Sequence, residues 1–205
     1  TELPMAAIEQ LTPLVQRIVV AKGGPYSRFA ANAYVVGTGA RATLVDTGTG
    51  DASSLEAALS QLRASNRVIA DVVLTHAHGG HANGLMLLRK HGFEGSAEKV
   101  AGNPRGELRF VADGDSFTAA DGSTAFKVFH TPGHSEDSIC LLLQQEQLLF
   151  SGDAISSLPT PSIHTLIENL DQYTSSLKRL TALGPRIILP GHGPVITDGL
   201  SYLAE

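Results

Sequence analysis

The chain has 205 residues, of which 42% are hydrophobic, and it carries 20 Asp and Glu against 15 Lys and Arg. The length and the hydrophobic fraction predict a single domain over residues 1–205 and argue against a second domain. Pro4 and Pro13 discourage continuous structure near the start, so residues 1–12 are predicted to be a tail. The net charge of -5 argues against nucleic acid as a partner, because such binders cluster Lys and Arg. The sequence contains no apolar run near the roughly 20 residues of a bilayer helix. We therefore expect a cytoplasmic protein without membrane contact, whose oligomeric state stays open.

The first half of the chain alternates β-rich runs with one amphipathic segment. Strands are predicted over residues 15–21, 33–36 and 42–45. The loop 22–29 is longer than a hairpin needs, and its Tyr26, Arg28 and Phe29 are candidates either for a substrate mouth or for plain surface packing. Asp51 is predicted to cap a helix, because the following apolar residues repeat at helical spacing: Leu55, Ala58, Leu59 and Leu62.

The second half continues the alternation. A strand over 68–74 precedes a helix from His81 to a stop at Gly92, and further strands are predicted over 108–111, around Phe117, and over 124–130, 138–143, 147–150 and 186–189. A helix ending at Gly184 carries a repeat that predicts core positions at Leu166, Leu170, Tyr173, Leu177 and Leu180. Strands alternating with amphipathic helices predict a layered α/β fold in which helices cover sheet.

Three histidines, His76, His78 and His81, fall within six residues directly after the strand 68–74. Imidazole is the commonest protein ligand for a transition metal, and side chains two residues apart past a strand end can converge on one ion. Taken alone, such a cluster is equally typical of a solvated loop.

Three other strand ends carry ligand-type residues in glycine-containing turns: His134, Asp153 and His192. Asp46 also follows a strand, either to accept a hydrogen bond from a ligand histidine or to form a turn with its own backbone. Cys140 lies in an apolar run and is predicted to be a buried, inert thiol. The repetition of ligand-type residues at strand ends favours a metal site over a solvated loop.

The order of these motifs resembles the metallo-β-lactamase superfamily. Within it, the chain looks most like the β-lactamase-like protein 2 branch and the fungal thioesterases that release polyketides from acyl carrier proteins. The closer similarity is carried by Tyr34-Val35-Val36-Gly37-Thr38-Gly39, Leu44-Val45-Asp46-Thr47-Gly48 and Leu189-Pro190-Gly191-His192-Gly193-Pro194-Val195-Ile196. The resemblance implies one αββα sandwich with a metal site at one edge of the two sheets.

The resemblance also implies a ligand set. His76, His78 and His134 match the first metal site, His81 and His192 match the second, and Asp153 matches the carboxylate that bridges both. It implies one or two zinc ions, of which one is firmly bound, with iron or manganese as alternatives. Asp153 is then the expected catalytic proton acceptor.

Two departures from the pattern stand out. Gly80 occupies the position where the superfamily usually has a metal-binding aspartate, which predicts either weaker occupancy of the second site or a single metal overall. The segment after Asp153 also differs, and its His164 is a candidate either to face the site or to lie on the surface.

These observations predict a metal-dependent hydrolase of an ester or thioester. Its expected substrate is a polyketide acyl group, free as a small molecule or bound to an acyl carrier protein. A first alternative is an oxygenase or lyase with one metal, iron for example, that rearranges a polyketide ring. A second alternative is a non-catalytic metal-binding protein.

Overall fold

The computed structural model describes residues 8–20, 30–49, 52–93, 96–100, 108–158 and 167–204. Its first sheet contains, in spatial order, β1 (Ile8–Gln10), β2 (Val15–Val20), β3 (Ala31–Val36), β4 (Arg41–Val45), β5 (Val68–Leu74), β6 (Ser96–Val100) and β7 (Leu108–Val111). Its second sheet contains, again in spatial order, β12 (Ile187–Pro190), β11 (Leu148–Gly152), β10 (Ile139–Leu143), β9 (Ala125–His130) and β8 (Ser116–Thr118).

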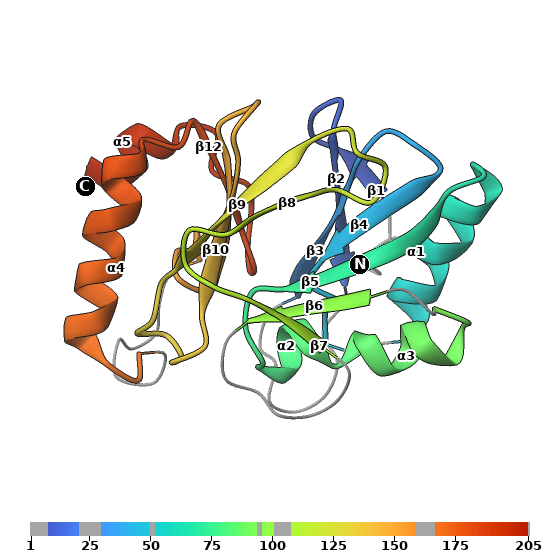
Figure 1. Cartoon of the computed structure of the whole chain (residues 1–205), viewed down its shortest axis with the longest axis horizontal. Coiled ribbons are helices and arrows are strands. Elements are labelled where there is room, and N and C mark those ends of the chain that lie inside the picture. The colour runs from blue at the N-terminus through green and yellow to red at the C-terminus, as the bar shows by residue number, and fades with distance from the viewer. Residues whose placement is uncertain are drawn as a thin grey trace.

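The two sheets pack face to face over the main hydrophobic core (Figure 1). Alternate residues of β3 separate the layers, because Tyr34 and Val36 enter this core while Ala33 and Val35 face the other way. Phe126 and Phe150, both from the second sheet, are among the largest fully buried side chains. Burying one such side chain contributes roughly 1.5–3 kcal/mol, so this shared core holds the two sheets together.

Helices cover both outer faces. The helices α1 (Ala52–Ala64) and α3 (Gly84–Lys90) pack Leu55, Leu59 and Leu88 onto the first sheet. The helix α4 (Leu170–Leu183) packs Leu180 onto the second sheet, and α5 (Gly199–Ala204) follows at the C-terminal end. Figure 1 shows α1 and α4 on opposite sides of the sheets. The αββα sandwich is confirmed. Among the described residues, none of the helices combines the length and apolar character that crossing a bilayer requires.

Strand direction brings the predicted motifs to one edge. The strands β4 and β5 run parallel, so Asp46 and His76 leave the first sheet on the same side. In the second sheet β11 is parallel to β12 and antiparallel to β10, which is antiparallel to β9. The strands β9, β11 and β12 therefore also end at a common edge. Backbone hydrogen bonds join the two edges: Ile139 N–H donates to Thr75 O at 2.9 Å and Asn32 N–H donates to Gly191 O at 2.7 Å.

Several predicted elements need correction. The predicted tail 1–12 includes the edge strand β1, which pairs antiparallel with β2 and places Ile8 opposite Ile18. The strand β6 was not predicted, since its sequence is largely polar. The single helix predicted from His81 to Gly92 is two, α2 (Gly79–Ala82) and α3, separated at Asn83.

The helix predicted before Gly184 is present as α4, with Asn169 as its N-cap and Gly184 in the left-handed conformation at its end. Leu180 is fully buried as predicted, whereas Leu170 is 58% exposed because it is the first residue of the helix. Asp51 and Leu166 lie outside the described residues.

Candidate metal centre

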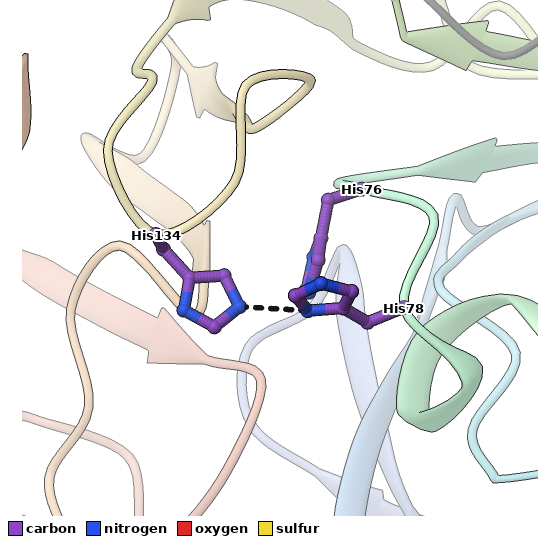
Figure 2. A group of neighbouring side chains, drawn as sticks. All are labelled: His76, His78 and His134. Atoms are coloured by element: carbon purple, nitrogen blue, oxygen red, sulfur yellow. Dashed lines mark hydrogen bonds between the residues drawn. The ribbon is translucent and has the colours of Figure 1, made fainter. Parts of the chain in front are cut away.

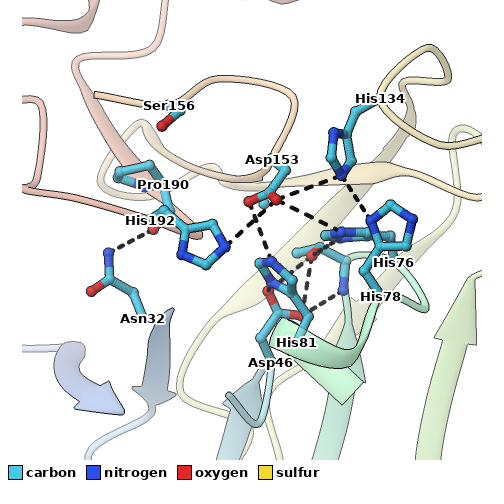
Figure 3. A network of polar contacts seen from close by, with 12 residues as sticks. Asn32, Asp46, His76, His78, His81, His134, Asp153, Ser156, Pro190 and His192 are labelled. Atoms are coloured by element: carbon cyan, nitrogen blue, oxygen red, sulfur yellow. Dashed lines mark hydrogen bonds and ion pairs between the residues drawn. The ribbon is translucent and has the colours of Figure 1, made fainter. Parts of the chain in front are cut away.

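The six predicted ligands meet at the common edge of the sheets, and Asp153 lies at their centre (Figure 3). His81 Nε2 lies 3.2 Å from Asp153 Oδ1. The other Asp153 oxygen, Oδ2, lies 3.5 Å from His134 Nε2, 3.6 Å from His192 Nε2 and 4.0 Å from His76 Nε2. Side chains that are up to 116 residues apart in the sequence, His76 and His192, thus face one carboxylate.

One candidate ligand group consists of His76, His78 and His134 (Figure 2), whose ligand atoms all lie within 4.8 Å of one another. His78 Nδ1 and His134 Nε2 are 3.0 Å apart. Two nitrogens bound to one tetrahedral zinc at 2.0–2.1 Å lie about 3.3 Å apart. The spacing of this pair is therefore close to what a single zinc ion requires.

A second candidate group consists of His76, His81 and Asp153, whose ligand atoms also lie within 4.8 Å of one another. His192 is beside this group through its contact with Asp153 and stacks edge-on with His81 at 5.2 Å between ring centroids. The two groups share His76, so they are halves of one continuous cluster.

Asp46 holds candidate ligands of the first sheet in place. Its carboxylate accepts from the Thr75 backbone N–H at 2.7 Å and from the Thr75 hydroxyl at 2.8 Å, and it pairs with His81 Nδ1 at 2.8 Å. Since the carboxylate only accepts, we assign the His81 proton to Nδ1, which turns Nε2 toward Asp153. Asp46 takes a left-handed backbone conformation, with φ 58°. Of its two predicted roles, the hydrogen bond to a candidate ligand histidine, His81, is the one observed.

His76 is oriented by a similar chain. The Thr75 hydroxyl donates to Asp46, so its oxygen is left to accept from His76 Nδ1, which is 3.1 Å away. The Nε2 atom of His76 then carries a lone pair that faces the cluster. This tautomer is the one that a metal ligand needs.

His192 follows β12 of the second sheet, and a residue beside β3 of the first sheet orients its ring. Its Nδ1 donates to Ala30 O at 2.9 Å, which leaves Nε2 to face Asp153. The buried Asn32 holds the turn that carries it, because its side-chain amide donates to Pro190 O at 2.9 Å and to Gly193 O at 2.8 Å. Asn32 was not predicted, and its only sequence signal is a polar residue inside the apolar strand β3.

The donor atoms of the cluster fit a cation. Among the described residues, His76 Nε2, His81 Nε2 and Asp153 Oδ1 are buried without a hydrogen-bond partner. A buried polar atom without a partner is costly, and here the three atoms belong to the three side chains of one candidate ligand group. Imidazole nitrogens with one carboxylate are a donor set suited to zinc or iron.

The buried side chains of the cluster shift one another's pKa values. Burial opposes protonation of His81, but Asp153 and Asp46 outweigh burial and raise the pKa of His81 to about 10. Burial, together with the charge of His81, lowers the pKa of His76. Burial alone would raise the pKa of Asp153, yet the facing histidines, His81 first, hold it well below its usual range. The site therefore attracts positive charge, which a metal ion would supply in place of protons.

The remaining predicted residues lie outside this cluster or outside the described residues. Tyr26, Arg28, Phe29 and His164 lie outside the described residues. Cys140 is fully buried, and burial raises the pKa of its thiol to about 12, as expected for an inert thiol. Two further histidines lie outside the cluster: His130 Nε2 is 2.9 Å from Glu136 O, and His91 Nε2 is 2.8 Å from the Glu56 carboxylate.

Comparison with known proteins defines the class. Residues 26–192 match the family described as the metallo-beta-lactamase superfamily. This is well over half of the chain, and the chain belongs to that superfamily. The resemblance read from the motifs is thus confirmed.

Several curated proteins have sequences similar to this chain. The chain is 37% identical over 191 residues to the lactamase-like protein adaB of Aspergillus niger, covering 93% of the chain and 58% of adaB. It is 37% identical over 203 residues to a beta-lactamase-like protein 2 homolog of Caenorhabditis elegans, covering 97% of the chain and 68% of the homolog. An atrochrysone carboxyl ACP thioesterase of Aspergillus fumigatus is 35% identical over 194 residues, covering 93% and 59%. The chain thus spans less than three fifths of the two Aspergillus proteins.

Solved structures agree on the fold. The DIM-1 metallo-beta-lactamase superposes with a TM-score of 0.78 at 22% identity, covering 100% of the chain and 95% of that structure. A metallo-beta-lactamase from Pontibacter korlensis gives a TM-score of 0.80 at 22% identity, covering 97% and 95%. At this identity, the similarity speaks for the fold alone.

Proposed function

We propose that the chain is a metal-dependent hydrolase that cleaves an ester or thioester. The observation that carries the proposal is the convergence of His76, His78 and His134 beside Asp153 at the sheet edge. Three imidazoles that leave a further coordination position open are a known arrangement for catalytic zinc. Membership of the superfamily and the thioesterase among its relatives support the same class of reaction.

His76, His78 and His134 would hold the ion, and His81, His192 and Asp153 would complete or extend its site. When bound, such an ion polarises a carbonyl group and lowers the pKa of a neighbouring water toward neutrality. Asp153 Oδ1 is buried without a hydrogen-bond partner among the described residues, so it can accept a proton from an attacking water. Thr75 and Asp46 keep the rings of His76 and His81 turned toward this point. Water and a thioester would then yield a carboxylate and a thiol.

The proposed substrate is an acyl group on a small molecule or on an acyl carrier protein. Support comes from relatives named as carboxyl ACP thioesterases in Aspergillus fumigatus and Aspergillus terreus, at 35% and 32% identity. We extend this to a polyketide acyl group, in line with the motifs shared with the fungal thioesterases. Zinc is the proposed ion.

The test is thiol release from an acyl thioester of N-acetylcysteamine by the zinc-loaded chain. Replacing His78 by Ala should lower kcat/KM by at least about a hundredfold, since it removes a ligand outright. The matched control is His91→Ala, which removes an imidazole bonded to Glu56 on the outer helical layer. Hydrolysis that survives His78→Ala at the parent rate would refute the proposal.

A second candidate function follows from the group His76, His81 and Asp153. Two imidazoles and one carboxylate with open positions suit non-haem iron that reacts with oxygen, or a lyase with one metal. Iron in the purified protein, with oxygen consumed in the presence of an aromatic polyketide, would favour this function. Tight metal binding with neither activity would favour a non-catalytic metal-binding protein.

A further inference from the structure

Gly80 leaves room for a Cβ atom beside His192. A Cβ atom built on Gly80 would lie 3.7 Å from His192 Nε2 and 3.8 Å from His192 Cε1, and within 4 Å it would meet no further described residue apart from its chain neighbours and its own helix. Both distances are ordinary van der Waals contacts. A Cβ atom at this position would therefore fit, and the nearest atoms that it would meet belong to the His192 ring.

Neighbouring glycines differ, because their backbones are in close contact with other atoms. A Cβ on Gly84 would lie 2.2 Å from Thr47 O, and one on Gly191 would lie 2.4 Å from His81 Cε1. Glycine is therefore required at those two positions by packing. Gly80 has no such requirement, and it is not among the residues with positive φ. Its absent side chain is better explained by what the space must admit.

The rings around this space face a single carboxylate, that of Asp153. His81 Nε2 is buried without a hydrogen-bond partner among the described residues, and His192 Nε2 faces Asp153 Oδ2 at 3.6 Å. Asp153 is the carboxylate that both rings face, since Asp46 lies behind His81 and is engaged with Thr75. A second divalent ion between His81, His192 and Asp153 would therefore have one anionic ligand, which it would share with the first ion. Hard oxygen anions are the donors that would complete it.

We propose that the space over Gly80 is a carboxylate subsite, filled by the acid that hydrolysis produces, and that this carboxylate completes the second metal position. The inference rests on the proposed function for its natural occupant, because cleavage of an ester or thioester by water releases a carboxylate at this centre. Occupation of the second position is then coupled to the ligand. Without a carboxylate the second ion is held weakly, and with one it is held more tightly.

Zinc binding to the metal-free chain tests the subsite without any turnover. Calorimetric titration is carried out in acetate and in chloride at equal ionic strength, with acetate as the probe. In the parent chain, acetate should tighten the second zinc by at least about fivefold and leave the first unchanged. Gly80→Asp supplies the carboxylate from the chain, so its second zinc should bind tightly in chloride and respond little to acetate.

Gly80→Asn is the matched control, because its side chain has nearly the shape of Asp without the charge. It should fill the space, abolish the acetate response and leave the second zinc weak. Urea unfolding of each variant verifies that it folds. The proposal is overturned if acetate fails to promote a second zinc in the parent chain, if it acts equally on Gly80→Asp, or if the parent holds two ions tightly in chloride.

The outcomes separate this inference from the proposed function. An acetate effect that depends on Gly80, in a chain that cleaves no thioester, supports the subsite and contradicts hydrolysis. Thioester cleavage without any acetate effect supports hydrolysis and contradicts the subsite. In an active chain, acetate should also inhibit competitively in the parent and lose this effect in Gly80→Asp.

Discussion

Replacing Asn32 should loosen the turn that carries His192. The Asn32 amide donates hydrogen bonds to Pro190 O and Gly193 O at 2.9 and 2.8 Å, across 158 and 161 residues of sequence. Each buried hydrogen bond contributes about 1 kcal/mol net, so Asn32→Ala should lower the free energy of unfolding by about 2–3 kcal/mol. In Asn32→Ala, Pro190 O still accepts the hydrogen bond from the Tyr34 hydroxyl at 2.7 Å. Most of the lost stability should therefore come from Gly193 O, which loses the bond from Asn32.

Asn32→Asp separates hydrogen bonding from packing. Asp has almost the shape of Asn, so a packing role predicts that it is milder than Ala. If donation matters, a buried carboxylate facing two carbonyl oxygens should cost more than Ala. Urea unfolding gives the stability, and competition with a chromophoric chelator gives the zinc affinity. A smaller loss for Asn32→Asp than for Asn32→Ala would refute the role assigned to the amide. Tyr34→Phe, which removes one bond to Pro190 O, should cost about 1 kcal/mol.

Other parts of the fold give independent tests. Burial alone would raise the pKa of Asp121, yet hydrogen bonds from Ser123, Gly39 and Thr38 lower it to about 2. A carboxyl group with a lowered pKa stabilises the fold at pH values above its ordinary pKa, and this stabilisation is lost as the pH falls from about 4 to about 2. Asp121→Asn should therefore lower the free energy of unfolding by about 1 kcal/mol at neutral pH, after allowance for solvent screening, and by almost nothing near pH 2. An equal loss in urea unfolding at both pH values would contradict this. Gly84→Ala would place its Cβ 2.2 Å from Thr47 O and should lower the free energy of unfolding by about 2–3 kcal/mol. The control Gly92→Ala, where nothing described lies within 4 Å of the added Cβ, should lower it by about 1 kcal/mol. Equal denaturation midpoints for the two variants would count against the close contact at Gly84. The fully buried Cys140 should react with an aromatic disulfide reagent only at the rate of unfolding, and rapid labelling of the folded chain would show that the thiol is accessible.

The sequence was most informative where a local pattern decides the structure. Apolar runs ending in glycine turns predicted β5, β9, β11 and β12, and the residues after them reach one centre because these strands end at the same edge of the sandwich. Asp46 could be predicted only as one of two roles, because a strand-end carboxylate serves equally well in a turn. The distance of 2.8 Å to His81 Nδ1 decides between them.

Two contacts between residues that are distant in sequence could not be predicted. Asn32 looks like an isolated polar residue in β3 until β12 is placed beside it, and its role then follows from two carbonyl groups in that turn. The short strand β1 has little sequence signal of its own and forms because the edge of β2 is available to it. Leu170 fits the helical repeat but begins α4, where the packed face has not yet started.

Metal content tests the central claim most directly. The claim is that His76, His78 and His134, beside Asp153, bind a divalent metal ion. Elemental analysis of the purified chain after dialysis against metal-free buffer should find about one transition-metal ion per chain, and His134→Ala should retain almost none. A parent chain that loses all of its metal, or a His134→Ala variant that keeps as much as the parent, would contradict the account.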